Sequence, residues 1–202
     1  DFCLFSPRKL LGVTDGGILH QTSNINVKPQ ALCNPPEDAL LEIFYAVLKR
    51  REFDLYGGDR DWNAHFHQGE DKFFPCNSKM SELSTILLKH AFDYEAIIEK
   101  RISNYSALLQ RLSDYAVFPE LTQDVVPLGF PVKIKDRNAV QERLFQANIF
   151  PPIHWKIDEF VPYRFQESHQ LANMIMTLPC DQRYEARDMN RMADIFIETI
   201  YK

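Results

Sequence analysis

The chain has 202 residues, of which 45% are hydrophobic, and its formal net charge is −5. This length and composition suit a globular protein of one or two domains with its own apolar core. The negative charge argues against a nucleic-acid-binding surface. No apolar run approaches the ~20 residues that a membrane-spanning helix needs. We therefore expect neither nucleic acid nor membrane as a partner.

The four cysteines are scattered along the chain and lack the Cys-x-x-Cys spacing of a zinc or redox motif. Such cysteines are typical of buried or free thiols in a reducing compartment. On this ground we expect a cytoplasmic protein.

The first candidate site lies at the start of the chain, where an apolar run from Phe2 to Phe5 predicts a buried strand end. Lys9 follows it closely, and Gly16 and Gly17 come seven and eight residues later. Glycines allow positive φ and close approach of the backbone, so Lys9 could point its amine into a cleft. A lysine buried there beside other cations would be a nucleophile for Schiff-base chemistry. From the pattern alone, a lysine near two glycines is more often a solvated surface residue.

The rest of the chain alternates helical and strand-like patterns. Apolar spacing predicts helices from the Pro35-Pro36 pair to about 51, from 81 to 115, from 137 to 147 and from 186 to 201. The helix over 81–115 exceeds the usual length, so we expect a bend or break in it. Strands are predicted at 116–118, 127–134 and 174–178, and the stretches 20–34, 54–75 and 156–173 carry no regular pattern. Asp136 is positioned to cap the helix that follows it. These elements predict a small α+β domain in the second half of the chain.

Two histidines, His65 and His67, stand near several acidic residues and raise the possibility of a metal site. A His-x-His pair without a defined third ligand is weak evidence for a metal. We predict a packing or solvated role for both histidines and no metal site.

The segment Ser6 to Gly17 resembles the cofactor-lysine segment of the DegT/DnrJ/StrS-type nucleotide-sugar aminotransferases, a family of fold-type-I pyridoxal-phosphate enzymes. That family has a serine, then the Schiff-base lysine, then Gly-Gly seven residues after it. Ser6 is closer to Lys9 than in the commonest form, and Asp15 stands where a glutamate is common. The resemblance implies pyridoxal 5′-phosphate as cofactor and Lys9 as its catalytic and cofactor-binding residue.

Two further segments carry the resemblance. Asn77-Ser78-Lys79-Met80 is similar to a tight family turn, which implies that Asn77 reaches across a homodimer to bind the partner's cofactor phosphate; from the residue alone, Asn77 could equally cap a helix. The segments 149–155 and 178–184 are similar to the family's C-terminal domain. There His154 is a substrate-binding candidate or else a packed histidine. Arg183 could bind a donor carboxylate, although a structural ion pair is the interpretation we prefer.

The resemblance covers almost the whole chain and implies its fold class. The class that it implies is an α/β protein, the C-terminal part of a fold-type-I aminotransferase, that ends in a small α+β domain with an antiparallel sheet. Residues 1–75 would complete the large cofactor-binding domain, and residues 76–202 would form the small domain with its linking helix. Because the chain starts inside a predicted strand, we expect it to belong to a longer protein and to be inactive alone.

The function that the resemblance implies is transfer of an amino group, commonly from glutamate, to a keto sugar carried on a nucleotide. The product would serve polysaccharide or related glycoconjugate biosynthesis. One alternative is a non-catalytic remnant that dimerises or binds a sugar nucleotide. Another is a pyridoxal-phosphate enzyme that modifies sugars by a different reaction.

Overall fold

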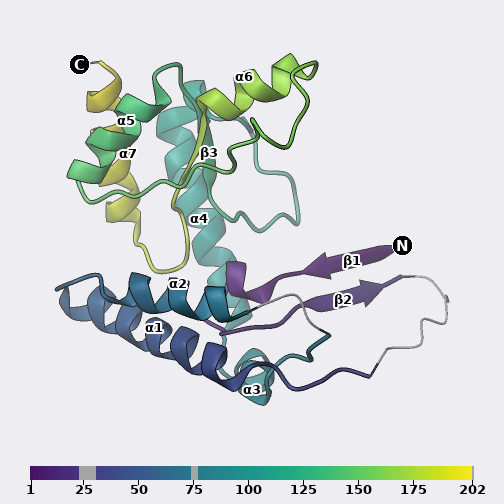
Figure 1. Ribbon diagram of the computed structural model, residues 1–202. Coiled ribbons are helices and arrows are strands. Elements are labelled where there is room, and N and C mark those ends of the chain that lie inside the picture. Colours follow the sequence, from purple (N-terminus) through teal and green to yellow (C-terminus); the bar gives the residue numbers. More distant parts are fainter. Residues whose placement is uncertain (23–30, 74–76, 202) are drawn as a thin grey trace. The chain divides into compact units, whose positions relative to one another are not determined.

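The computed structural model describes residues 1–22, 31–73 and 77–201 (Figure 1). The chain divides into two compact units, Asp1–Phe92 and Asp93–Lys202, and each is described by itself. The boundary between the two units follows Phe92 in the sequence, whereas the predicted domain boundary lies between residues 75 and 76. The assignment of those domains to cofactor binding stays a prediction.

The first unit begins with a hairpin of two antiparallel strands, β1 (Phe2–Phe5) and β2 (Ile18–Gln21), drawn as the two purple arrows in Figure 1. A single 3₁₀ turn, η1 (Pro7–Lys9), follows β1. The strand at Phe2–Phe5 is confirmed, but its predicted burial is wrong, because Leu4 is 79% exposed. In the described part of the chain β1 pairs only with β2, so the hairpin keeps its apolar side chains exposed.

Two helices, α1 (Glu37–Tyr56) and α2 (Trp62–Lys72), pack together in the first unit. The start of α1 just after Pro36 is as predicted, since proline is favoured where a helix begins. A Cβ on Gly69 would lie 2.4 Å from Ile43 Cγ1 and 3.3 Å from the Ala39 carbonyl, so glycine allows the two helices this close approach. The prediction of irregular structure over 54–75 is wrong for α2. This helix buries only Gly69, so its sequence has no apolar stripe that would predict a helix.

The predicted helix over 81–115 is broken, as expected. It consists of α3 (Glu82–His90) and α4 (Tyr94–Leu112), followed by a 3₁₀ turn, η2 (Ser113–Tyr115). Asp93 starts the second helix, because its side chain accepts a hydrogen bond of 3.0 Å from the Ala96 amide. This carboxylate satisfies one of the amides that every helix leaves unpaired at its first turn.

The second unit has an antiparallel pair of strands, β3 (Phe130–Lys133) and β4 (Ile175–Leu178), with Val132 opposite Met176. Three helices, α4, α5 (Arg137–Gln146) and α7 (Ala186–Ile200), supply the rest of its core, and α7 packs against the other two. The largest fully buried side chains of this core are Leu108, Leu112, Phe130, Val132, Leu144, Met176, Leu178, Met189 and Phe196. The predicted helices, the strands within 127–134 and 174–178 and the small antiparallel sheet are confirmed here. The strand predicted at 116–118 is wrong, because Ala116 forms only an isolated bridge with Val132.

Two further predictions fail in this unit. Helix α6 (Gln166–Met174) lies in a stretch predicted to be irregular. None of its residues is buried, so its sequence carries no apolar pattern that would predict a helix. Asp136 precedes α5 but makes no side-chain capping bond. Within the described ranges, no helix combines the length and apolar character that crossing a membrane requires.

Candidate functional site

Lys9 ends the short turn that follows β1. Its backbone amide donates to the Ser6 carbonyl at 3.1 Å, and the amides of Leu10 and Leu11 both donate to the Pro7 carbonyl, at 3.0 and 2.9 Å. The Lys9 side chain is exposed in this structure, and its catalytic and cofactor-binding role stays a prediction. Among the described residues its amine has neither a hydrogen-bond nor an ion-pair partner, which leaves it open to a ligand.

The neighbouring cation is bound differently. Arg8 donates to Glu70 on α2 at 2.9 Å, and its guanidinium lies 6.0 Å from the ring centre of Phe66. Arg8 therefore fastens the turn to α2. Of the two adjacent cations, only Lys9 keeps its charged group unengaged by the described residues.

A buried polar cluster joins the lysine segment to the start of α3. Asp15 Oδ1 accepts hydrogen bonds from the hydroxyls of Ser81 at 2.6 Å and Ser84 at 2.5 Å, and Asp15 Oδ2 accepts one of 2.7 Å from the Ser81 amide. The Thr14 hydroxyl donates to Asp15 Oδ1 at 3.2 Å. All four residues are at most 7% exposed. Two of the segments that carry the family resemblance, 6–17 and 77–83, are thereby held together.

Sequence reasoning missed the role of Asp15, which it noted only as a departure from the family pattern. The available signal was the pair of serines three residues apart, Ser81 and Ser84, directly before an apolar helical stripe. Nothing in that pattern says that the carboxylate they bind comes from the start of the chain.

Gly16 provides the close approach that its sequence position predicts. Its φ is +101°, and a Cβ there would lie 2.4 Å from Met80 Cε. Residues other than glycine rarely adopt this backbone conformation. Met80 therefore packs directly on the glycine turn, beside the Asp15 cluster.

Asn77 lies exposed at the edge of the same region. Its carbonyl accepts a hydrogen bond of 2.9 Å from the Cys33 amide, and the Lys79 amide donates to the Cys33 carbonyl at 3.0 Å. The cap of α3 is Ser81, whose hydroxyl accepts a 3.1 Å hydrogen bond from the Ser84 amide. The capping alternative for Asn77 is therefore wrong, and its phosphate-binding role stays a prediction.

His154 belongs to the second unit, so its position is described apart from that of Lys9. Its side chain is exposed, and its Nδ1 lies 3.3 Å from the Thr177 hydroxyl on β4. The ring also lies beside Trp155, with 5.6 Å between ring centres. This is an accessible histidine rather than a packed one, and its substrate-binding role stays a prediction.

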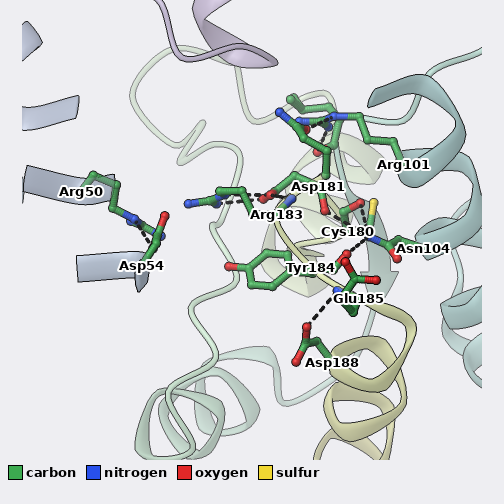
Figure 2. Close-up of polar contacts among 12 residues, drawn as sticks. Arg50, Asp54, Arg101, Asn104, Cys180, Asp181, Arg183, Tyr184, Glu185 and Asp188 are labelled. Atoms are coloured by element: carbon green, nitrogen blue, oxygen red, sulfur yellow. Dashed lines mark hydrogen bonds and ion pairs between the residues drawn. The ribbon is translucent and has the colours of Figure 1, made fainter. Parts of the chain in front are cut away.

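Arg183 forms the ion pair that the sequence favoured. Its Nε and Nη2 donate to the two carboxylate oxygens of Asp181, each at 2.8 Å, as Figure 2 shows. Burial alone would raise the pKa of Asp181, but the hydrogen bonds and charge of Arg183 outweigh it and lower that pKa. A donor carboxylate would have to displace this fork to use Arg183.

Helix α4 holds the loop that carries this ion pair. The Asn104 amide donates to the carbonyls of Asp181 and Tyr184, each at 3.0 Å, and Arg101 donates to Gln182 Oε1 at 2.7 Å (Figure 2). Burial raises the pKa of the Cys180 thiol to about 12. Cys180 is therefore an inert core residue, since the thiolate is the reactive form.

The two histidines of α2 lie outside any metal site that the described residues could form, because no three metal-binding side chains gather among them. His65 Nδ1 lies 3.1 Å from Glu42 Oε2, and Lys72 donates to Glu42 Oε1 at 3.2 Å. These hydrogen bonds lower the pKa of Glu42, and the bond with His65 has the larger effect. His65 also packs edge-on against Tyr45, with ring centres 4.6 Å apart, so it serves the contact between α1 and α2.

Comparison with solved structures relates this arrangement to known folds. A structure from Streptococcus pneumoniae, described as a sugar aminotransferase in its PMP form, superposes with a TM-score of 0.57 at 13% identity; the match covers 92% of this chain and 49% of that one. A DegT DnrJ EryC1 StrS aminotransferase from Brucella abortus gives a TM-score of 0.50 at 14% identity, over 71% of this chain and 45% of that one. This chain has the fold of part of a DegT/DnrJ/StrS-type aminotransferase.

The likeness confirms the fold class and the family resemblance at the level of the fold. The chain spans about half the length of each of these two proteins. No protein-family model matches the sequence, and no curated protein matches it either. The likeness therefore rests on three-dimensional structure, which persists at identities of 13 and 14%.

Proposed function

We propose that this chain is part of a pyridoxal-phosphate-dependent aminotransferase that moves an amino group from glutamate to a keto sugar carried on a nucleotide. The observation that carries the proposal is the likeness to the Streptococcus pneumoniae sugar aminotransferase over 92% of this chain. The amino sugar would enter polysaccharide or related glycoconjugate biosynthesis.

The residues of the first unit fit the chemistry of this cofactor. Pyridoxal phosphate needs a primary amine for its aldehyde and hydrogen-bond donors for its phosphate. Lys9 offers an exposed amine without a partner among the described residues, and Asn77 offers an exposed side-chain amide. When bound, the cofactor's pyridine ring withdraws electrons from the bond that breaks at the donor's α-carbon.

In this proposal Lys9 moves the proton. Its neutral amine takes a proton from the α-carbon of the amino donor as general base, and its ammonium form returns a proton as general acid. Positioned proton transfer of this kind typically accelerates a reaction by ~10²- to 10⁴-fold. Asn77 holds the phosphate, and His154 contacts the sugar substrate.

The half-reaction with glutamate tests this function in the longest protein that contains the chain. We expect one equivalent of 2-oxoglutarate per site, together with loss of the cofactor's aldehyde absorbance. Lys9→Ala should abolish both signals, while Lys79→Arg, at an exposed lysine outside the proposed chemistry, should retain them. A folded, cofactor-loaded protein that makes no 2-oxoglutarate would contradict glutamate transamination. A pyridoxal-phosphate enzyme that modifies sugars by a different reaction would give that result. A non-catalytic remnant would not bind the cofactor at all.

We further propose a homodimer in which Asn77 of one subunit serves the cofactor of the partner. Subunits that carry Lys9→Ala should regain activity when mixed with subunits that carry Asn77→Ala, because one hybrid site then has both residues intact. Heterodimers that form without any recovered activity would count against shared sites.

A further inference from the structure

We propose that Asp15 is the positioning residue for Lys9: it holds the lysine segment against the start of α3 and so fixes where the Lys9 amine lies. This inference rests on the proposed function, because it assigns Asp15 a role in that same site. It concerns a residue that touches neither substrate nor cofactor and that acts through Lys9.

The first support is the geometry of the Asp15 carboxylate. Its two oxygens accept three hydrogen bonds of 2.5 to 2.7 Å from Ser81 and Ser84, and a fourth from Thr14 at 3.2 Å. Hydrogen bonds to an ionised carboxylate are stronger than hydrogen bonds between neutral groups. It also lies at the N-terminal end of α3, where the helix dipole favours negative charge.

The second support is the short, hydrogen-bonded connection between Asp15 and Lys9. The turn at Pro7 binds the amides of Leu10 and Leu11, and the Val13 amide donates to the Leu11 carbonyl at 2.9 Å. Val13 itself is only 3% exposed. Movement of Asp15 would therefore be transmitted to Lys9 through a few residues that are already hydrogen-bonded.

The third support comes from the segment before α3, which contains both Asn77 and a serine that Asp15 binds. Ser81 follows Asn77 by four residues, and its amide and hydroxyl are both held by Asp15. Met80, between them, packs on Gly16. One carboxylate thus holds the segment of Lys9 against the segment of Asn77, the residue proposed to serve the partner's site.

The test compares Asp15→Asn with a matched control, Asp93→Asn, in the longest protein that contains the chain. Asp93 is also a carboxylate at the start of a helix, but it caps α4 and belongs to the other unit. Two readouts are used: hydrogen exchange of the amides of residues 10–13, and the affinity for pyridoxal phosphate measured as label fixed on Lys9 by borohydride.

We expect Asp15→Asn to speed exchange at residues 10–13 and to weaken cofactor affinity at Lys9 by about tenfold, as loss of charge-assisted hydrogen bonds would. Asp93→Asn should change neither readout. Asp15→Glu, which restores the carboxylate, should recover part of the labelling. Equal exchange and equal labelling in Asp15→Asn and Asp93→Asn would overturn the inference.

Two other results are possible: Asp15→Asn could fail to fold, or the wild-type protein could take no label on Lys9. If Asp15→Asn fails to fold, Ser84→Ala removes one of the bonds to Asp15 Oδ1, and it should raise exchange at residues 10–13 by a smaller amount; unchanged exchange would overturn the inference. If the wild-type protein takes no label on Lys9, the proposed function fails, and with it the positioning role. The exchange comparison would then show separately whether Asp15 holds this segment.

Discussion

Asp15 Oδ2 accepts a 2.7 Å hydrogen bond from the Ser81 amide, across a sequence separation of 66 residues. Through this bond the segment around Asp15 and the start of α3 form one buried polar cluster. The segments that most resemble an aminotransferase are joined there, so the stability of this contact bears directly on the proposed site.

Gly16→Ala should destabilise the first unit. The backbone at this position has a φ of +101°, and the added methyl would meet Met80. A side chain held in such a conformation costs of order 1–3 kcal/mol, although Met80 can move and relieve part of the contact. Urea unfolding should show this loss. The control is Gly12→Ala, which meets nothing within 4 Å and should change stability by no more than about 0.5 kcal/mol.

Asn104→Ala should destabilise the second unit. The Asn104 side chain is 2% exposed, and its amide binds the carbonyls of Asp181 and Tyr184. Leaving a buried carbonyl without a donor costs about 1–3 kcal/mol, and since these two bonds are only partly buried we expect a total loss in that range. Urea unfolding should report the loss, with faster hydrogen exchange over residues 180–184. Ser103→Ala, one position away on the exposed side of α4, should have little effect; an equal loss there would refute the role assigned to Asn104.

The helices that could be predicted are those with an apolar stripe. Helix α7 buries Met189, Met192, Ala193 and Phe196 at helical spacing, so the pattern is visible in the sequence. Helix α2 buries only a glycine and α6 buries nothing, so neither leaves such a pattern. Strand β1 was predicted from its apolar residues, but its exposure depends on which segments cover it, and that information is not local.

The candidate site divides in the same way. Lys9, Asn77 and His154 were identified by resemblance, which depends on short runs of residues. The two serine partners of Asp15 lie more than sixty residues away, and only the folded chain brings them to it. The exposure of Lys9 likewise depends on tertiary structure, so the sequence pattern alone could not decide between an amine in a cleft and a solvated one.

The Asp181–Arg183 ion pair should make stability depend on acid pH. The folded-state pKa of Asp181 lies below its ordinary value of 3.8, so the stabilisation is fully present above that value and is lost as pH falls through the folded-state pKa. The stability difference between wild type and Asp181→Asn should therefore be constant near pH 7 and should shrink below about pH 4. Arg183→Met should remove this pH dependence, and its persistence in that variant would exclude Arg183 as the cause.

The central claim is that Lys9 carries the cofactor, and the site of covalent labelling tests it most directly. The longest protein that contains this chain would be incubated with pyridoxal phosphate, reduced with borohydride, digested and mapped by mass spectrometry. We expect the added mass on the peptide that contains Lys9, and none on that peptide in a Lys9→Arg variant. Label on a different lysine, or no label in a protein shown to be folded, would contradict the account.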